Sequence, residues 1–379
     1  MIRPADRLSQ LQEYYFSKKL KEVARLKAEG KDIINMGIGS PDKIPHEHVI
    51  SELIESSIRP DSHGYQPYQG IPALREAIID FTTKQYHVKL APEEILPLIG
   101  SKEGITHISL AYLNPEDVVL VPELGYPTYS SVTNMVQGKL DFYPLEEDKN
   151  WEPDWEFFDK YDFTNVKIMW LNYPHMPTGQ KGSLEILERF VKLAQDKQFL
   201  LCHDNPYSFL QDDKPLSIFN IEGAKEVAVE LNSLSKTFNM AGWRVGWIAG
   251  AQHILEPILK VKSNMDSGMF KPVQLAAAKA LSLGDSWYQN QSDLFASRRK
   301  SMQEFLNLLE CDVEPDQAGM FVWAKVGSGT ADELCDRLLY EKEIFVTPGH
   351  IFGPKGNNYI RVSLCLDESI IQKAIKRLA

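Results

Sequence analysis

The feature that most constrains the fold is an alternation of apolar runs with amphipathic segments, beginning near residue 95. The runs, which we expect to be strands, are EILPLIG, DVVLVP, VKIMWLNYP, FLLCHDNPY and EVAVELNSLS. Helical spacing predicts helices over residues 101–113 and 183–197, with these inward residues: Ile105, Ile108 and Tyr112, then Leu184, Leu187, Val191 and Ala194. Continuous apolar strands between such helices indicate an α/β fold with a mostly parallel sheet covered on both faces.

The rest of the chain predicts a second, smaller domain. A length of 379 residues exceeds what one core usually serves. After about residue 275 the pattern changes to mixed short strands and helices, ending in NYIRVSLCL and a helix from Asp367. Near the start, Phe16, Leu20, Val23 and Leu26 recur at helical spacing before Gly30. We expect residues 46–275 to form the large domain, and residues 276–379 to form a small α+β domain together with part of residues 1–45.

Charge and composition exclude several functions. A net charge of −11 argues against binding nucleic acid through its phosphates. The charged N-terminus lacks a signal peptide's apolar region, and no stretch reaches the roughly 18 apolar residues of a membrane helix. Four widely spaced cysteines are typical of a reducing compartment, so we expect a cytoplasmic protein. His46 and His48 have no companions at zinc-ligand spacing, and we interpret them as a solvated turn rather than a metal site.

Polar residues gather where the predicted strands end, at the edge where such sheets bind ligands. They are Gly100-Ser101-Lys102, Tyr126, Asn172, Asp204 and the run from Ser233 to Lys236. The GSKEG stretch also offers backbone N–H groups at a helix start, which suits an anion. Tyr126 could stack on a ring or fill the core.

Lys236, in the stretch SLSKTFNMAGWRVGW, has two interpretations. A structural lysine would extend to water. A desolvated lysine would be nucleophilic and could form a Schiff base. Because Ser233, Ser235 and Arg244 could bind a phosphate nearby, the pattern favours pyridoxal 5′-phosphate as the cofactor.

That cofactor needs an anion against its ring nitrogen, and Asp204 is placed to supply one. The alternative is an ordinary turn aspartate before Asn205-Pro206. Tyr207 could donate a hydrogen bond to the ring's 3-oxygen. Arg361 interrupts an apolar strand, either on its solvent face or as a two-pronged clamp for a substrate carboxylate.

Taken together, these stretches resemble the class I aminotransferases of the aspartate aminotransferase fold. The resemblance runs from NMGIGSPD to YIRVSL and includes GYQPYQGIPALREAI, GSKEG, GYPTY, DNPY and the lysine stretch. GSKEG and residues 262–270, KSNMDSGMF, are similar to the diaminopimelate-type aminotransferases within that class. The resemblance implies a homodimer with shared active sites.

The resemblance also implies a role for each residue. Lys236 would be the Schiff-base lysine and proton shuttle, Asp204 the partner of the pyridinium nitrogen and Tyr207 a partner of the 3-oxygen. Tyr126 would stack on the ring. The phosphate would be held by Ser101, Lys102, Ser233 and Arg244, with Tyr65 reaching across from a second subunit. Arg361 would clamp the substrate carboxylate, near the Gly39 backbone and Asn172.

One position departs from the family pattern. NYPHMPTG places Met176 where the family has an asparagine that donates to the cofactor's 3-oxygen. His175 or a water beside the thioether could supply the missing donor. For a second charged group on the substrate, Lys262 and Lys271 are the nearest candidate partners.

The predicted function is amino-group transfer from an amino acid to a 2-oxo acid by a ping-pong mechanism. A lyase of the same fold, breaking a C–S or related bond, is the alternative. A non-catalytic cofactor-binding protein ranks last, because both Lys236 and Arg361 are present.

Overall fold

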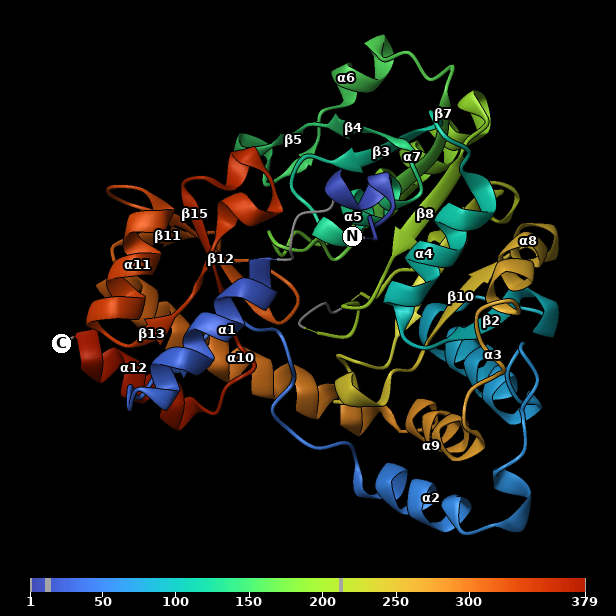
Figure 1. Cartoon of the computed structure of the whole chain (residues 1–379), viewed down its shortest axis with the longest axis horizontal. Coiled ribbons are helices and arrows are strands. Elements are labelled where there is room, and N and C mark those ends of the chain that lie inside the picture. The colour runs from blue at the N-terminus through green and yellow to red at the C-terminus, as the bar shows by residue number, and fades with distance from the viewer. Residues whose placement is uncertain (1, 11–14, 211–213, 379) are drawn as a thin grey trace.

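The computed structural model describes residues 2–10, 15–210 and 214–378 and confirms the predicted α/β architecture (Figure 1). A seven-stranded sheet has the order β2-β10-β9-β8-β7-β3-β4. Neighbouring strands are parallel except where β10 pairs with β2 and β9. The bounds are β2 Ile95–Leu98, β3 Val118–Pro122, β4 Lys139–Tyr143, β7 Val166–Asn172, β8 Leu200–Asp204, β9 Ala228–Ser233 and β10 Gly246–Gly250.

Successive side chains along each strand point to opposite faces of this sheet, and helices cover both faces. On one face, Ile105 of α4 (Ser101–Tyr112) lies in an apolar cluster with Trp170. On the other, Leu187 of α7 (Leu184–Lys197) lies in a cluster with Met169, the residue before Trp170 in β7. The predicted inward position of Leu184 is wrong: this side chain is 51% exposed because α7 begins there.

The smaller part joins the two ends of the chain. Its sheet has the order β11-β12-β15-β14, all antiparallel (Cys311–Val313, Phe321–Val326, Tyr359–Ser363 and Thr347–Pro348). β1 (Ile34–Asn35) pairs in parallel with β13 (Ile344–Phe345). Helix α1 (Tyr15–Ala28) packs Val23 and Leu26 against Leu339 of α11 (Ala331–Glu341). The N-terminal segment therefore completes a smaller α+β unit, as predicted, while the boundaries at residues 45 and 275 stay predictions.

The remaining elements surround these two parts (Figure 1). Their bounds are α2 Glu47–Ser57, α3 Pro72–Tyr86, α5 Pro127–Met135, α6 Trp155–Lys160, α8 Gln252–Lys262, α9 Lys271–Leu281, α10 Asp285–Leu308, α12 Glu368–Leu378, β5 Leu145–Glu146 and β6 Glu152–Pro153. His46 Nδ1 accepts a hydrogen bond from His48 N at the start of α2. The four cysteines are buried free thiols. Among the described residues, no helix combines the length and apolar character that a membrane span needs.

Candidate active site

A cavity of about 310 Å³ lies at the carboxyl ends of the central strands, with walls from both parts of the chain. Asn172, Asp204 and Ser233 are the last residues of β7, β8 and β9, and Arg361 enters from β15. The predicted site residues that line this cavity are Gly39, Ser101, Lys102, Tyr126, Asn172, Asp204, Tyr207, Ser233, Lys236, Arg244 and Arg361. The structure thus brings together residues that are up to 322 positions apart, from Gly39 to Arg361.

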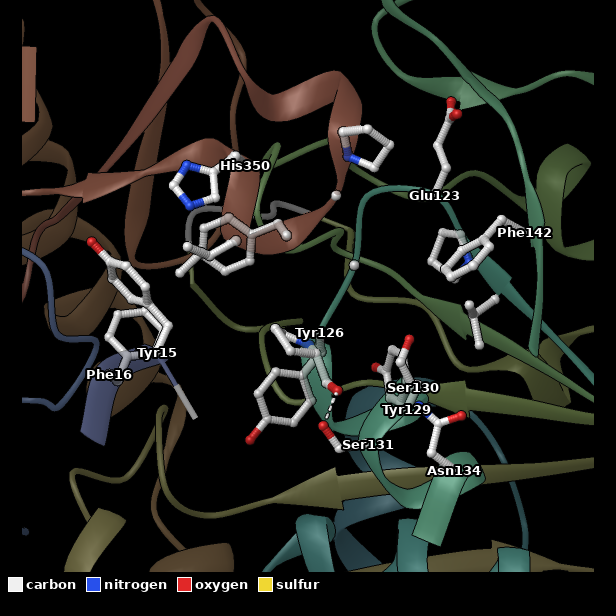
Figure 2. A pocket seen from close by; sticks show the side chains of 18 of the residues that line it. Tyr15, Phe16, Glu123, Tyr126, Tyr129, Ser130, Ser131, Asn134, Phe142 and His350 are labelled. Carbon is white, nitrogen blue, oxygen red and sulfur yellow. Dashed lines mark hydrogen bonds between the residues drawn. The ribbon is translucent and has the colours of Figure 1, made fainter. Parts of the chain in front are cut away.

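A second cavity, of about 540 Å³, adjoins the first (Figure 2). Phe16, Tyr126 and Phe352 line both cavities and therefore form the wall between them. Tyr126 precedes α5 and has the ring of Tyr129 edge-on at 5.7 Å. The structure is compatible with both stacking on a bound ring and filling the core, because the half-buried Tyr126 ring packs against the core and also lines the first cavity.

The start of α4 forms an anion-binding corner of the first cavity. Ser101 and Lys102 open the helix after Gly100, whose φ is +76°. A side chain at Gly100 would bring its Cβ within 2.1 Å of Arg244 Nη2, so only glycine allows this approach. Arg244 Nη1 donates to Ser235 Oγ at 3.3 Å. A helix N-terminus and a guanidinium together favour a phosphate here.

Lys236 is half-buried and lines the cavity, which favours the nucleophilic over the structural interpretation of this lysine. Its Nζ donates to the Gly39 carbonyl oxygen at 2.7 Å. Burial, as the largest cause, lowers the pKa of the amine below its usual value. The close packing of residue 39 against Phe321 requires glycine, because a Cβ there would lie 2.1 Å from Phe321 Cζ. Burial favours a neutral amine, the nucleophilic form.

Asp204 is only 5% exposed, and its carboxylate belongs to the cavity rather than to a turn. Oδ2 accepts from the Tyr129 hydroxyl at 2.8 Å, whereas Oδ1 has no hydrogen-bond donor among the residues that the structure describes. Burial raises the pKa of this carboxyl to about 6. Asn172 Nδ2 donates to the Asp204 backbone oxygen at 2.7 Å and fixes the strand end. A buried acceptor that lacks a donor suits a cationic N–H from a bound ring.

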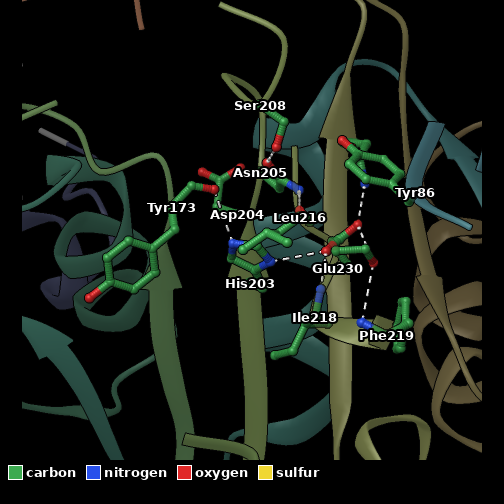
Figure 3. Close-up of polar contacts among 12 residues, drawn as sticks. Tyr86, Tyr173, His203, Asp204, Asn205, Ser208, Leu216, Ile218, Phe219 and Glu230 are labelled. Carbon is green, nitrogen blue, oxygen red and sulfur yellow. Dashed lines mark hydrogen bonds and ion pairs between the residues drawn. The ribbon is translucent and has the colours of Figure 1, made fainter. Parts of the chain in front are cut away.

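An ion pair lies behind Asp204 in the core (Figure 3). His203 Nδ1 is 3.0 Å from Glu230 Oε2, and its Nε2 is 3.1 Å from the Tyr173 carbonyl oxygen. Both ring nitrogens therefore face oxygen atoms of buried partners. His203, one residue before Asp204, opposes the effect of burial on the pKa of that carboxyl.

Arg361 is also buried, at 5% exposure, and does not lie on a solvent face. Its guanidinium carbon is 3.8 Å from the ring centre of Phe321 and 4.6 Å from that of Phe352. Nη2 donates to the Gly37 carbonyl oxygen at 3.1 Å, and Nη1 lies 3.2 Å from Met176 Sδ. The aromatic rings hold the planar fork at the cavity wall, where it can meet a carboxylate.

His175 does not supply the hydrogen-bond donor that is missing because Met176 stands where the family has an asparagine. Its Nε2 is 3.0 Å from the Leu124 carbonyl oxygen, which can only accept, so this nitrogen carries the proton. Nδ1 accepts from the Thr178 hydroxyl at 2.8 Å. Burial lowers the pKa of His175 to about 4, and the ring does not line the first cavity.

Three candidate residues lie outside the cavity. Tyr65 is 91% exposed. Lys262 is fully buried in an ion pair with Asp266, with Nζ and Oδ2 2.5 Å apart. Lys271 Nζ is 2.5 Å from Asp61 Oδ2. The suggestion that either lysine meets a charged end of the substrate is therefore not supported within this chain.

Sequence reasoning missed several side chains that line the site: Phe16, Ile38, Phe321 and Phe352. It also gave no role to Tyr129. The signal for Tyr129 was present, since it ends the quoted GYPTY stretch. The aromatic residues come from segments far apart in the chain and carry no local signal.

The sequence relatives identify the family. Residues 31–378 match the family described as aminotransferase class I and II, and the chain belongs to it. An LL-diaminopimelate aminotransferase from Halothermothrix orenii is 37% identical, over 99% of this chain and 97% of the relative. One from Dehalococcoides mccartyi is 35% identical, over 100% and 98%. The protein is an aminotransferase, as predicted.

Solved structures share the fold of this chain. Substrate-bound BacF from Bacillus subtilis has a TM-score of 0.95 and 32% identity, covering 100% of this chain and 97% of its own. An aspartate aminotransferase from Thermus thermophilus has a TM-score of 0.92 over 100% and 99%, and at 23% identity it supports the fold alone.

Proposed function

We propose that this aminotransferase uses pyridoxal 5′-phosphate to move an amino group from an amino acid to a 2-oxo acid in a ping-pong cycle. The observation that carries the proposal is that Lys236 and Asp204 line one cavity, together with the start of α4 and Arg244, which suit an anion. When bound, the cofactor supplies an electron sink for the substrate's Cα carbanion. The unpaired Oδ1 of Asp204 fits a protonated ring nitrogen, which supports this choice of cofactor.

We propose one task for each group around the cofactor. Lys236 holds it covalently, and Ser101, Lys102, Ser233 and Arg244 hold its phosphate. Asp204 binds the ring nitrogen, Tyr207 donates to the 3-oxygen and Tyr126 stacks on the ring, with Asn172 beside it. Burial raises the pKa of Tyr207, which keeps its hydroxyl protonated as a donor.

The substrate's groups are divided between Arg361 and Lys236. Arg361 binds the α-carboxylate with two parallel hydrogen bonds, close to the Gly39 backbone. Once the substrate's amino group had displaced Lys236 from the cofactor, the freed neutral amine would accept the proton from the substrate's Cα. Burial, as the largest cause, lowers the pKa of this amine and so favours its neutral form.

Lys236→Ala in the purified holoenzyme tests the proposal. We expect turnover to be lost while the phosphate contacts still bind some cofactor. Near-normal transamination by the variant would refute the mechanism.

For the wild-type protein, an amino acid added alone should release one equivalent of 2-oxo acid per site. Continuous release of ammonia and pyruvate would instead indicate the lyase.

We also propose a cytoplasmic homodimer whose two sites are shared. Tyr65 is exposed on a segment outside the first cavity, and in a dimer it can reach the phosphate site of the neighbouring subunit. Residues 262–270 would contribute to the same interface. Sedimentation that detected an active monomer at assay concentration would refute this arrangement.

A further inference from the structure

We propose that Arg298 is a positioning residue for the substrate site. With Asp42 it anchors the backbone of residues 37–42, whose carbonyl groups contact Lys236 and Arg361. Neither member of this ion pair lines the first cavity. The inference rests on the proposed function, in which Arg361 binds the substrate's carboxylate, and it gives a task to a buried charge that the proposed chemistry does not use.

Residues 37–42 contact two of the site's charged groups through their backbone. The Gly37 carbonyl oxygen accepts from Arg361 Nη2 at 3.1 Å, and the Gly39 carbonyl oxygen accepts from Lys236 Nζ at 2.7 Å. None of the residues 37–42 belongs to a helix or a strand. The segment therefore lacks the regular hydrogen bonds of secondary structure, and its position depends on other anchors.

The segment is anchored on both sides of Gly39. On one side, β1 pairs with β13 shortly before it, and Thr347 Oγ1 donates to the Gly37 carbonyl oxygen at 3.0 Å. On the other side, both arms of the Arg298 guanidinium meet the Asp42 carboxylate: Nη1 lies 2.7 Å from Oδ1, and Nη2 lies 2.7 Å from Oδ2. A two-pronged pair of this kind fixes orientation as well as distance.

Arg298 is itself well fixed, because it lies within α10 and its side chain is only 1% exposed. Its Nη1 also donates to the Leu364 carbonyl oxygen at 3.0 Å, directly after β15. Figure 1 shows the chain between α1 and α2 passing α10, where the contact with Asp42 is made. One guanidinium thus joins the segment that carries Gly39 to the end of the strand that carries Arg361.

Lys43 makes a weaker contact with the same carboxylate. Its Nζ lies 3.8 Å from Asp42 Oδ2 and 3.2 Å from Asp367 Oδ2, and its side chain is 44% exposed. Exposed pairs of this type contribute little, so the anchoring of Asp42 depends on Arg298. Buried pairs gain little net stability from their charges, which points to geometry as the use of the Asp42–Arg298 pair.

Arg298→Lys in the holoenzyme tests this role, because lysine keeps the charge but cannot form the two-pronged pair. The Arg361 fork and the Gly39 backbone bind the same carboxylate before and during the reaction, so we expect KM for the amino acid to rise at least about fivefold while kcat and the cofactor dissociation constant stay within about twofold. A KM within about twofold of the wild-type value, or a loss of kcat or cofactor affinity as large as the change in KM, would overturn the inference. A wild-type holoenzyme without transaminase activity would instead refute the proposed function, and the inference with it.

A second measurement follows the segment itself. Hydrogen–deuterium exchange of the holoenzyme, read by mass spectrometry, should be at least about threefold faster in the peptide covering residues 36–44 of Arg298→Lys than in that of the wild type. Unchanged exchange in this peptide would mean that Arg298 does not hold the segment, which overturns the inference.

Asp32→Asn is the matched control. Asp32 pairs with Lys373 and Arg377 of α12, so it ties the chain to the smaller unit just before β1. Because this pair is exposed and lies beyond β1, the control should leave both KM and the exchange of residues 36–44 within about twofold of the wild-type values. A rise in KM equal to that of Arg298→Lys would indicate general loosening and contradict a specific role for Arg298.

If Arg298→Lys did not fold, the double variant Asp42→Asn/Arg298→Met would take its place. It removes both charges together, so neither is left buried without a partner. We expect the same rise in KM and the same faster exchange, because the anchor is lost. A wild-type KM in the folded double variant would overturn the inference.

Discussion

Replacing Tyr129 with phenylalanine would isolate one hydrogen bond to the carboxylate that faces the site. The Tyr129 hydroxyl donates to Asp204 Oδ2 at 2.8 Å. Its ring is stacked on Trp170, with centroids 4.8 Å apart and planes 7° apart. Phenylalanine preserves this stack, so the change removes only the hydroxyl.

The expected effect depends on the charge of Asp204. A hydrogen bond to a charged group contributes about 1.5–3 kcal/mol, and one to a neutral group about 1 kcal/mol. The ionised form of Asp204 therefore loses about 1 kcal/mol more than the protonated form. Because one pKa unit corresponds to about 1.4 kcal/mol, the carboxyl pKa should rise from about 6 to nearly 7.

The sign of the pH dependence follows from the raised pKa. Burial lifts the Asp204 pKa from 3.8 to about 6, so the folded protein holds this proton more tightly than the unfolded chain. The free energy of unfolding then falls as pH rises from about 4 to 6, and in Tyr129→Phe the fall continues to about pH 7. The variant should lose about 1 kcal/mol more at pH 8 than at pH 5.

Urea unfolding of the cofactor-free protein at pH 5 and pH 8, at one protein concentration, measures this difference. Tyr143→Phe is the control, because the buried Tyr143 hydroxyl donates to the uncharged Trp170 carbonyl oxygen at 3.0 Å. The control should lose the same free energy at both pH values. If Tyr129→Phe also lost equal amounts, its hydroxyl would not be stabilising the carboxylate.

Three further substitutions test other contacts of the site. Arg361→Lys keeps the positive charge but loses the planar guanidinium, so kcat/KM for amino acids should fall at least tenfold while cofactor affinity stays unchanged. A fall below about threefold would exclude Arg361 as the group that binds the substrate carboxylate. Met176→Asn should restore a donor to the cofactor's 3-oxygen and so lower, by about one to two units, the pH midpoint at which the visible absorption of the lysine-bound cofactor changes. An unchanged midpoint would mean that the methionine affects only packing. Glu230→Gln removes the carboxylate that faces His203 Nδ1 in the core. If the two groups form a charged pair, unfolding should cost about 3–5 kcal/mol less, and a loss under about 1 kcal/mol would contradict such a pair.

The chemistry at the strand ends could be predicted from the sequence because it follows from local patterns. Asp204 ends an apolar run, and parallel strands bring their carboxyl ends to one edge of the sheet. Strand β10 was missed because its residues, Gly246–Gly250, begin within the lysine stretch, follow β9 without an α-helix between them and pair antiparallel.

The aromatic residues around Arg361 could not be predicted in the same way. Phe16 lies on α1, Phe321 on β12 and Phe352 at the end of the 3-10 helix Gly349–Phe352, and only the tertiary fold brings them to Arg361. Alternation along β15 did not indicate whether the Arg361 side chain faced water or the interior. Tertiary packing decided this, since every residue of that strand is buried.

Burial shifts the pKa of both Lys236 and Asp204 toward the value that favours the neutral form. Burial lowers the pKa of the Lys236 amine and raises that of the Asp204 carboxyl, because removing either group from bulk water disfavours its charged form. For the lysine this is useful at once, since the neutral amine is the nucleophile and the base. For the aspartate it is a cost, which the Tyr129 hydroxyl and His203 offset only in part. A cationic ring nitrogen at Oδ1 would supply the remainder, so the site is most stable when the proposed cofactor is bound.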